Sequence, residues 1–243
     1  MFVVLPAMVD LATRIRDDEL MDQPGLPVSQ HDRALAGLQR VNTWSRTASR
    51  IWTALHSLAI RRNLTQLRLL DLACGGGDVC VKLAQLADAN GVCVDIQGWD
   101  RSRTAVEFAT RAAARKQLRS VSFFERDVLN DPISGEFDAV ISTLFFHHLE
   151  AADAVRLLRK MSASAKHAVL VDDLRRTKLG YWLARWGTRL LSRSPVVHFD
   201  GPISVRSAFT CAEFRALAAE AGLDKLDIET HWPQRFLARW ERP

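Results

Sequence analysis

The chain has 243 residues, of which 48% are hydrophobic and 25% are charged, and these fractions exclude a disordered or low-complexity protein. Its net charge is only +5, from 33 basic and 28 acidic residues, which indicates a local basic patch rather than a generally basic protein. A chain of this length suits one large α/β domain with attachments.

Two further patterns bear on the compartment. The apolar N-terminus, residues 1–9, lacks the basic segment of a signal peptide, and no apolar run approaches the roughly 20 residues that cross a bilayer. The four cysteines show no CxxC pair and fit reduced, mostly buried thiols. We therefore expect a soluble, cytoplasmic protein.

Residues 31–60 repeat apolar side chains at helical spacing and predict one long helix or two short ones. We place them in an N-terminal helical extension, residues 1–62, that acts as a lid. From residue 63 to 243, short apolar runs alternate with amphipathic stretches, which predicts a parallel sheet with both faces covered. The expected strands are 67–73, 92–99, 121–125, 137–143, 168–172 and 226–230, and the expected helices are 79–87, 102–116, 151–161 and 211–221.

About forty residues separate the fifth strand from the helix at 211, far more than a usual connection. We predict a helical cap at about 175–209 whose first half is an amphipathic helix flanked by arginines and whose second half, 194–204, is an ordered loop. The arginines could rest on an anionic membrane surface. Aromatic residues form either a lid over the site or ordinary core: Trp44, Trp52, Trp182, Trp186, Phe199 and Phe209.

A glycine-rich turn, Gly75-Gly76-Gly77, follows the first strand and lets the backbone approach a ligand closely. Acids stand on both sides of this turn, at Asp71 and Asp78. They suit a ligand that carries an ammonium and a sulfonium better than one that carries phosphates.

Three more markers lie at strand ends. Asp100 closes the second strand, where a carboxylate can accept from both hydroxyls of a ribose, and Asp127 follows the third, where it can accept from an adenine amino group. The fourth marker is the strand 137–143. In this order the four motifs resemble those of class I S-adenosylmethionine (SAM)-dependent methyltransferases.

That resemblance spans about residues 67–230 and implies a Rossmann-like, seven-stranded, mostly parallel sheet, with a last antiparallel strand near 234–239 inserted beside the sixth. It implies SAM as cofactor, with S-adenosylhomocysteine as product. Ala73 stands where the family usually has its first glycine and is tolerated if its φ is negative. By position, the resemblance assigns cofactor binding to Asp71, Ala73, Gly75, Gly77, Asp100, Arg101, Asp127, Val128 and Ser142. Helix capping and turn formation are the alternatives for the aspartates.

The acceptor is indicated more loosely. The chain looks most like the small-molecule branch related to ubiquinone and menaquinone methyltransferases. Residues 18–22, 33–45 and 198–210 resemble bacterial methyltransferases associated with type III polyketide synthases, which implies O-methylation of a phenolic or polyketide acceptor in secondary metabolism. The Asn/Asp-Pro-Pro-Tyr/Phe segment typical of amine methylation is missing after the fourth strand, so amine acceptors lose weight.

His147 and His148 follow the fourth strand, and one of them is expected to be the general base that removes the proton of a phenol. The alternative is that they cap a helix or pack in the core. Asp172 and Asp173 could orient a histidine or contact substrate, and no metal site is predicted. His198 and Asp200 are weaker candidates, since Asp200-Gly201 also suits a turn.

Three other functions are also compatible with the sequence. C-methylation of a quinol or polyketide ring needs the same deprotonation as O-methylation. RNA methylation would use the basic segment, but no RNA-binding module is visible, so we expect no nucleic-acid partner. A SAM-binding protein without catalysis is the third alternative. The sequence does not predict the oligomeric state.

Overall fold

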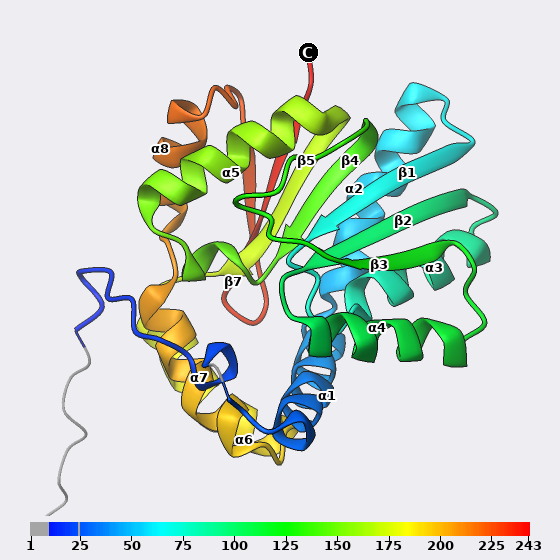
Figure 1. The fold of residues 1–243 in the computed structure, drawn as a ribbon. Coiled ribbons are helices and arrows are strands. Elements are labelled where there is room, and N and C mark those ends of the chain that lie inside the picture. The colour runs from blue at the N-terminus through cyan, green and yellow to red at the C-terminus, as the bar shows by residue number, and fades with distance from the viewer. Residues whose placement is uncertain (1–9, 24) are drawn as a thin grey trace, which may run out of the picture.

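A computed structural model describes residues 10–23 and 25–243 of the chain. The described residues form a seven-stranded sheet in the order β3-β2-β1-β4-β5-β7-β6 (Figure 1). β7 is antiparallel to both of its neighbours, whereas the remaining pairs are parallel. The predicted Rossmann-like, mostly parallel sheet is confirmed. Its strands are β1 (Gln66–Leu72), β2 (Cys93–Asp100), β3 (Val121–Glu125), β4 (Phe137–Thr143), β5 (Ala165–Leu174), β6 (Asp227–His231) and β7 (Arg235–Glu241).

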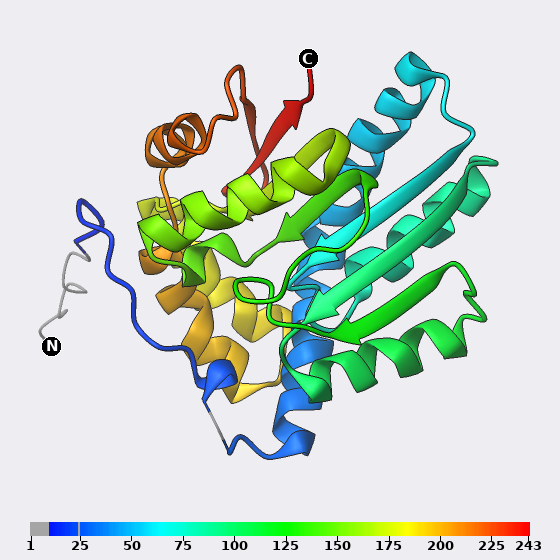
Figure 2. The ribbon, with the colours of Figure 1, turned by 45° about the horizontal axis from the view of Figure 1, so that its top comes forward.

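Helices cover both faces of the sheet. Figure 2 shows α5 in front of the strands, with α2 and α3 behind them. The helices are α1 (Val28–Ser45), α2 (Thr47–Arg62), α3 (Asp78–Ala89), α4 (Arg103–Arg115), α5 (Ala151–Ser164), α6 (Lys178–Leu191), α7 (Pro195–Ser207) and α8 (Cys211–Glu220), with 3₁₀ turns η1 (Leu20–Asp22) and η2 (Phe146–His148). In the described part of the chain, every helix is too short or too polar to span a lipid bilayer.

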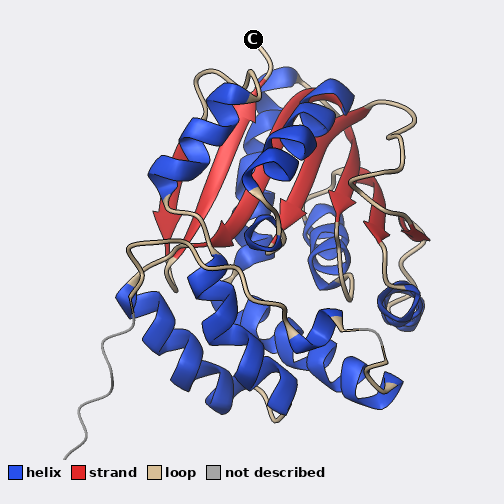
Figure 3. Cartoon of the chain, turned by 60° about the vertical axis from the view of Figure 1, so that its left-hand side comes forward, coloured by secondary structure: helices blue, strands red, loops and turns tan. Residues whose placement is uncertain are grey.

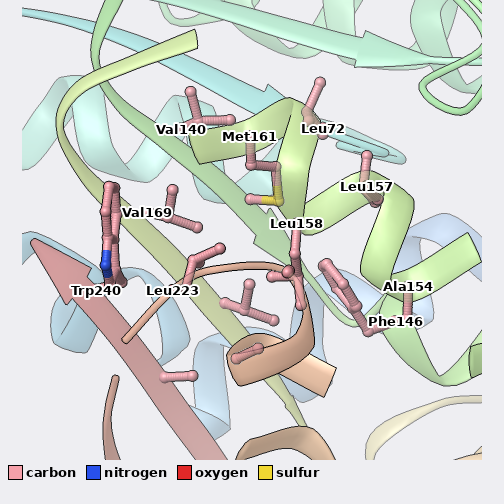
Figure 4. Close-up of a cluster of buried hydrophobic side chains, with 14 of the residues drawn as sticks. Leu72, Val140, Phe146, Ala154, Leu157, Leu158, Met161, Val169, Leu223 and Trp240 are labelled. Carbon is pink, nitrogen blue, oxygen red and sulfur yellow. The ribbon is translucent and has the colours of Figure 1, made fainter. Parts of the chain in front are cut away.

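The core is split by the sheet into two layers, because successive side chains of a strand point to opposite faces. Leu70 and Leu72 of β1 pack in the layer with α5 and α8, whereas Leu67 and Leu69 pack in the layer with α2 and α3. Each such leucine is fully buried and contributes about 2 kcal/mol. The first layer also holds Phe146, beside Leu158 and Ala154 of α5 (Figure 4).

The N-terminal extension contains two helices rather than one. Arg46 adopts the left-handed conformation, with φ 57°, and separates α1 from α2. Ile51, Leu55 and Leu58 of α2 are buried in the same core layer as Leu67 and Leu69 of β1. Trp52 belongs to that core, and Trp44 is exposed and lies edge-to-face against Trp232.

The insertion after β5 forms two helices, α6 and α7, which lie beyond the carboxyl ends of the parallel strands (Figure 3). The expectation of an ordered loop at 194–204 was therefore wrong. Asp200-Gly201-Pro202 has the composition of a turn, but Pro195 begins a helix at a position where proline is favoured. Burial of Val196, Val197 and Val205 stabilises that helix although Pro202 lies inside it.

The aromatic residues do not form a single lid. Phe209 is buried in the core under the guanidinium of Arg14, whose Cζ lies 3.9 Å from the ring centroid. Trp186 and Phe199 are more than half exposed on the outside of α6 and α7.

Candidate active site

The sites named from sequence meet at one edge of the sheet because the strands that precede them are parallel and in register. Leu72 at the end of β1 pairs with Trp99 of β2 and with Ser142 of β4. Asp100 pairs with Glu125, the last residue of β3. The segments after these strands therefore leave the sheet side by side, where ligands bind in open α/β sheets.

The turn after β1 is built from left-handed residues. Gly75 and Gly77 have φ of 51° and 69°, which glycine adopts without a steric penalty. Ala73 has φ 57°, so the condition of a negative φ stated for it is not met, and it carries a cost of about 1–2 kcal/mol. A Cβ on Gly77 would lie 2.6 Å from the Phe123 ring, whereas a Cβ on Gly75 would meet nothing within 4 Å. Gly75 therefore faces open space.

Asp100 connects this turn to the end of β2. Its Oδ2 accepts from the backbone N–H of Gly75 at 2.8 Å, and its Oδ1 accepts from that of Ser102 at 2.8 Å. Ser102 in turn caps α4 by accepting from Ala105. Arg101 lies exposed beside it. The carboxylate thus fixes the two loops that the motif pattern assigns to the methionine and ribose ends of SAM.

Three carboxylates gather beneath the turn. Burial raises the pKa of Asp71 to about 7, the Cys80 thiol that donates to it at 3.2 Å lowers it, and the charges of Asp78 and Asp100 raise it further. Oδ1 of Asp71 is buried without a hydrogen-bond partner. Burial also raises the pKa of Asp78. A cationic ligand would relieve this concentration of negative charge, and the open space at Gly75 admits one, so the residues present fit SAM.

Asp127, Val128 and Ser142 are engaged in the fold itself. Asp127 accepts from the N–H groups of Leu129 and Asn130 and from the Asn130 side chain, which is a turn-forming arrangement. Val128 is buried, and its carbonyl accepts from Lys160. The Ser142 hydroxyl donates to the Leu72 carbonyl at 3.0 Å. Asp127 and Val128 lie at the strand end expected for adenine, and their contact with it stays a prediction.

The two histidines lie in η2, directly after β4. Phe146 fixes this turn, because its ring is fully buried and meets Phe214 edge-to-face at 5.4 Å. His147 Nδ1 donates to Asp173 Oδ1 at 2.6 Å, and its backbone N–H donates to the other oxygen at 3.1 Å. Asp173, the last residue but one of β5, thus orients a histidine, which was one of the alternatives predicted for it from the sequence.

Glu19 completes the group and was missed as a site residue. Its Oε1 lies 3.6 Å from His147 Nε2 and 3.9 Å from His148 Nε2. Burial opposes a charge on His147, but Asp173 and Glu19 outweigh it and raise the pKa of His147 to about 10. The only sequence signal for Glu19 was its place in the segment 18–22 that resembles polyketide-associated methyltransferases.

Glu19, His147 and His148 also offer three metal-type ligand atoms within 4.8 Å of one another. However, Asp173 and Glu19 raise the pKa of His147 to about 10, so both of its ring nitrogens carry protons at neutral pH and offer no lone pair to a metal. We assign no metal to this group.

The remaining candidates have structural partners. Asp172 accepts from His231 Nε2 at 2.7 Å, which joins β5 to β6. His198 Nε2 bonds the carbonyl of Ser192 within the cap. Asp200 accepts from the backbone N–H groups of Leu20 and Met21 and so caps η1. All four cysteines are free thiols; Cys74 and Cys80 are buried, and Cys93 is exposed.

Comparison with known proteins agrees with this geometry. Residues 69–168 match the family described as "Methyltransferase domain". Among curated proteins, none matches the chain at a significant level.

Solved structures share the fold. A putative O-methyltransferase from Nostoc punctiforme superposes with a TM-score of 0.60 at 18% identity, covering 82% of this chain and 56% of that one. Magnesium protoporphyrin IX methyltransferase from Synechocystis, with bound S-adenosylhomocysteine, has a TM-score of 0.57 at 17% identity and covers 92% and 91%. An O-methyltransferase family 2 protein from Planctomyces limnophilus in complex with apigenin has a TM-score of 0.55 at 18% identity and covers 73% and 50%.

This chain therefore spans about half the length of two of these three structures. Residues 69–168 thus match a methyltransferase domain, and the fold of the chain is shared with solved methyltransferases, among them one with bound S-adenosylhomocysteine.

Proposed function

We propose that the chain transfers a methyl group from SAM to a hydroxyl of a small, hydrophobic, phenolic or polyketide acceptor. The observation that carries this proposal is the group Asp173–His147–Glu19–His148 at the carboxyl end of β4. Such a group accepts a proton from a hydroxyl, which raises the nucleophilicity of the oxygen.

Cofactor binding and proton acceptance are assigned to two different parts of the site. The turn after β1 and Asp100 bind the cofactor, which supplies an electrophilic methyl group when bound. η2 places its imidazoles beyond β4, and α6 and α7 lie over the same edge of the sheet (Figure 3), where they would shield a bound acceptor from water.

Within the group we assign proton acceptance to His148. His147 has a carboxylate beside each ring nitrogen, and its raised pKa of about 10 keeps it protonated at neutral pH. A histidine that already carries both protons cannot accept another. The side chain of His148 is 25% exposed, so an acceptor entering the site can reach it.

Support for a phenolic acceptor is indirect. The Planctomyces O-methyltransferase family 2 protein was solved in complex with apigenin, which is a phenol. C-methylation of a quinol or polyketide ring would use the same deprotonation, and the position of the methyl group in the product separates the two reactions.

Single-turnover rates test the assignment. His148→Ala should lower the rate of transfer by roughly a hundredfold to ten-thousandfold at neutral pH and leave SAM binding nearly unchanged. The loss should shrink as the pH rises toward about 10, because a phenol that is already ionised needs no base. If His148→Ala transfers at the rate of the unsubstituted protein at neutral pH, the base is not His148.

A further inference from the structure

A segment far from His147 and His148 in the sequence contacts the backbone of the turn that carries them. Residues 10–22, which we call the strap, run between η2 and α7 before α1 begins. The Arg14 guanidinium donates to the carbonyl oxygens of His147 at 2.9 Å and Leu149 at 2.7 Å. Arg16 donates to the carbonyl of His148 at 3.2 Å.

The other side of the strap is bound to the cap. The Asp200 carboxylate of α7 accepts from the N–H groups of Leu20 at 2.8 Å and Met21 at 3.2 Å. The Ser204 hydroxyl donates to Glu19 Oε1. The strap is therefore tied on both sides of Glu19, and this fixes where the Glu19 carboxylate lies.

That carboxylate is nearly buried, with 11% of its side chain exposed. Burying an unpaired carboxylate is costly, so its position requires cationic or hydrogen-bonding neighbours. Burial by itself would raise its pKa, but His148, His147 and Ser204 outweigh that effect and lower it. Glu19 is thus ionised beside both histidines.

Three of the four side chains, Asp173, His147 and Glu19, alternate in charge. Asp173 is ionised because His147 outweighs the effect of its burial and lowers its pKa, and His147 is protonated between Asp173 and Glu19. The net charge of these three groups is −1. Oε1 of Glu19 presents that charge to His148 Nε2 at 3.9 Å, a distance that a small shift of either side chain shortens to a hydrogen bond.

We propose that Glu19 is a positioning residue for methyl transfer, in which it orients the His148 imidazole and stabilises the imidazolium that forms there. The proton leaves the acceptor oxygen and is held on a His148 ring nitrogen, while Glu19 keeps its negative charge throughout. A carboxylate beside one nitrogen of an imidazole has this effect in hydrolase triads. The inference rests on the proposed function, and it gives Glu19, alone among the residues of the strap, a direct role beside the His148 ring.

Glu19→Gln is the test, because it removes the charge and keeps the shape. We expect kcat to fall at least on the order of tenfold at neutral pH, with KM for SAM unchanged. The acidic limb of kcat/KM should move to lower pH, because a negative neighbour that favours the protonated ring has been removed. The charged groups near His148 are Glu19 and Arg16 from the strap, His147 from η2 and Asp173 from β5, and of these only Glu19 changes.

Asp17→Asn is the matched control. It removes the same charge from the same strap, but Asp17 pairs with Arg206 of α7 at 3.0 Å rather than with a histidine. This variant should keep the kcat and the pH profile of the unsubstituted protein. Glu19→Asp, which restores the charge on a shorter side chain, should recover part of the lost rate.

A second measurement does not need the acceptor. Histidine ring resonances followed by NMR against pH should show the His147 ring titrating at lower pH in Glu19→Gln than in Asp17→Asn, because Glu19 helps to raise the pKa of His147. Equal titration in both variants, or a loss of kcat in Glu19→Gln that only follows a loss of folding stability, overturns the positioning role. A protein that shows the NMR shift and binds SAM but methylates no hydroxyl instead contradicts the proposed function.

Discussion

The charge of a single residue, Asp71, should be visible in how the cofactor binds. Burial first, and then the carboxylates of Asp78 and Asp100, raise its pKa to about 7. Its ionised form favours a cationic ligand, so the affinity for SAM should rise as the pH increases from about 5.5 to about 7.5, on the order of tenfold. The ligand's own amino group has a pKa near 8 and begins to titrate in this range, so calorimetry compares the protein with an Asp71 variant at each pH.

Asp71→Asn is the control for this effect and should bind SAM with nearly constant affinity over the same range. A flat profile in the unsubstituted protein, or an equal slope in both proteins, would rule out Asp71 as the source. The sign for folding is opposite: the folded chain holds this proton more tightly than the unfolded chain. The contribution of Asp71 to the free energy of unfolding therefore falls as pH rises from about 4 toward 7.

Two glycines of one turn should respond differently to the same substitution. A Cβ on Gly77 would meet Phe123 at 2.6 Å and Ala109 at 2.7 Å at a φ of 69°, so Gly77→Ala should lower the free energy of unfolding by at least about 2 kcal/mol. A Cβ on Gly75 would enter open space, so Gly75→Ala should cost only about 1 kcal/mol of stability but weaken SAM binding. Urea unfolding and calorimetry on both variants check this, and equal effects on stability would contradict it.

At this scale the sequence predicted residue types better than their partners. Asp71, Asp100 and the glycines could be placed because each stands at a fixed distance from a strand end. The sequence could not decide between His147 and His148 as the base, because the choice depends on Asp173 and Glu19. Asp173 lies 26 residues after His147 in the chain, and Glu19 lies 128 residues before it. Asp127 carried both an adenine and a turn interpretation, and the structure shows the turn contacts.

Among the elements, the cap shows where local signals are overridden. α6 was predicted from its periodic apolar stripe. Thr177 caps its N-terminus, because the Thr177 side chain accepts from the N–H of Gly180. α7 was not predicted, because an Asp-Gly-Pro sequence is typical of turns and only tertiary burial of its valines selects the helix.

The outer face of α6 is open to an acceptor or to a membrane surface. Leu179, Trp186 and Leu190 are 54%, 58% and 88% exposed, and the guanidinium groups of Arg185 and Arg189 lie 5.8 Å and 5.6 Å from the Trp186 ring centroid. We propose that this face receives hydrophobic acceptors, which collect at anionic membranes.

Replacing Trp182 and Trp186 together by alanine should therefore lower kcat/KM for tailed acceptors more than for short ones and leave the affinity for SAM unchanged. Ile60→Ala, at a 69% exposed position of α2, is the control and should change neither quantity. A double variant that loses SAM affinity but keeps its acceptor preference would show that α6 serves the cofactor instead.

For the whole molecule, the sheet was the most predictable feature. Strands 121–125 and 137–143 were placed with their observed bounds. Strand 137–143 is a short, mostly buried apolar run, as expected of a central parallel strand, whereas strand 121–125 lies half-exposed at the edge of the sheet. The strap was the least predictable feature. Its described residues form only the short turn η1, and side-chain contacts with η2 and α7 give it its place, so neither periodicity nor composition indicates it.

The most direct test of the central claim is mass spectrometry of phenols and polyketide pyrones incubated with the protein and with SAM labelled in its methyl group. If the chain is an O-methyltransferase with His148 as its base, we expect a product heavier by one labelled methyl group that is attached to oxygen. The variant His148→Ala should form this product far more slowly. A labelled product methylated on carbon, or SAM that binds but is never consumed with any acceptor of this class, would contradict it.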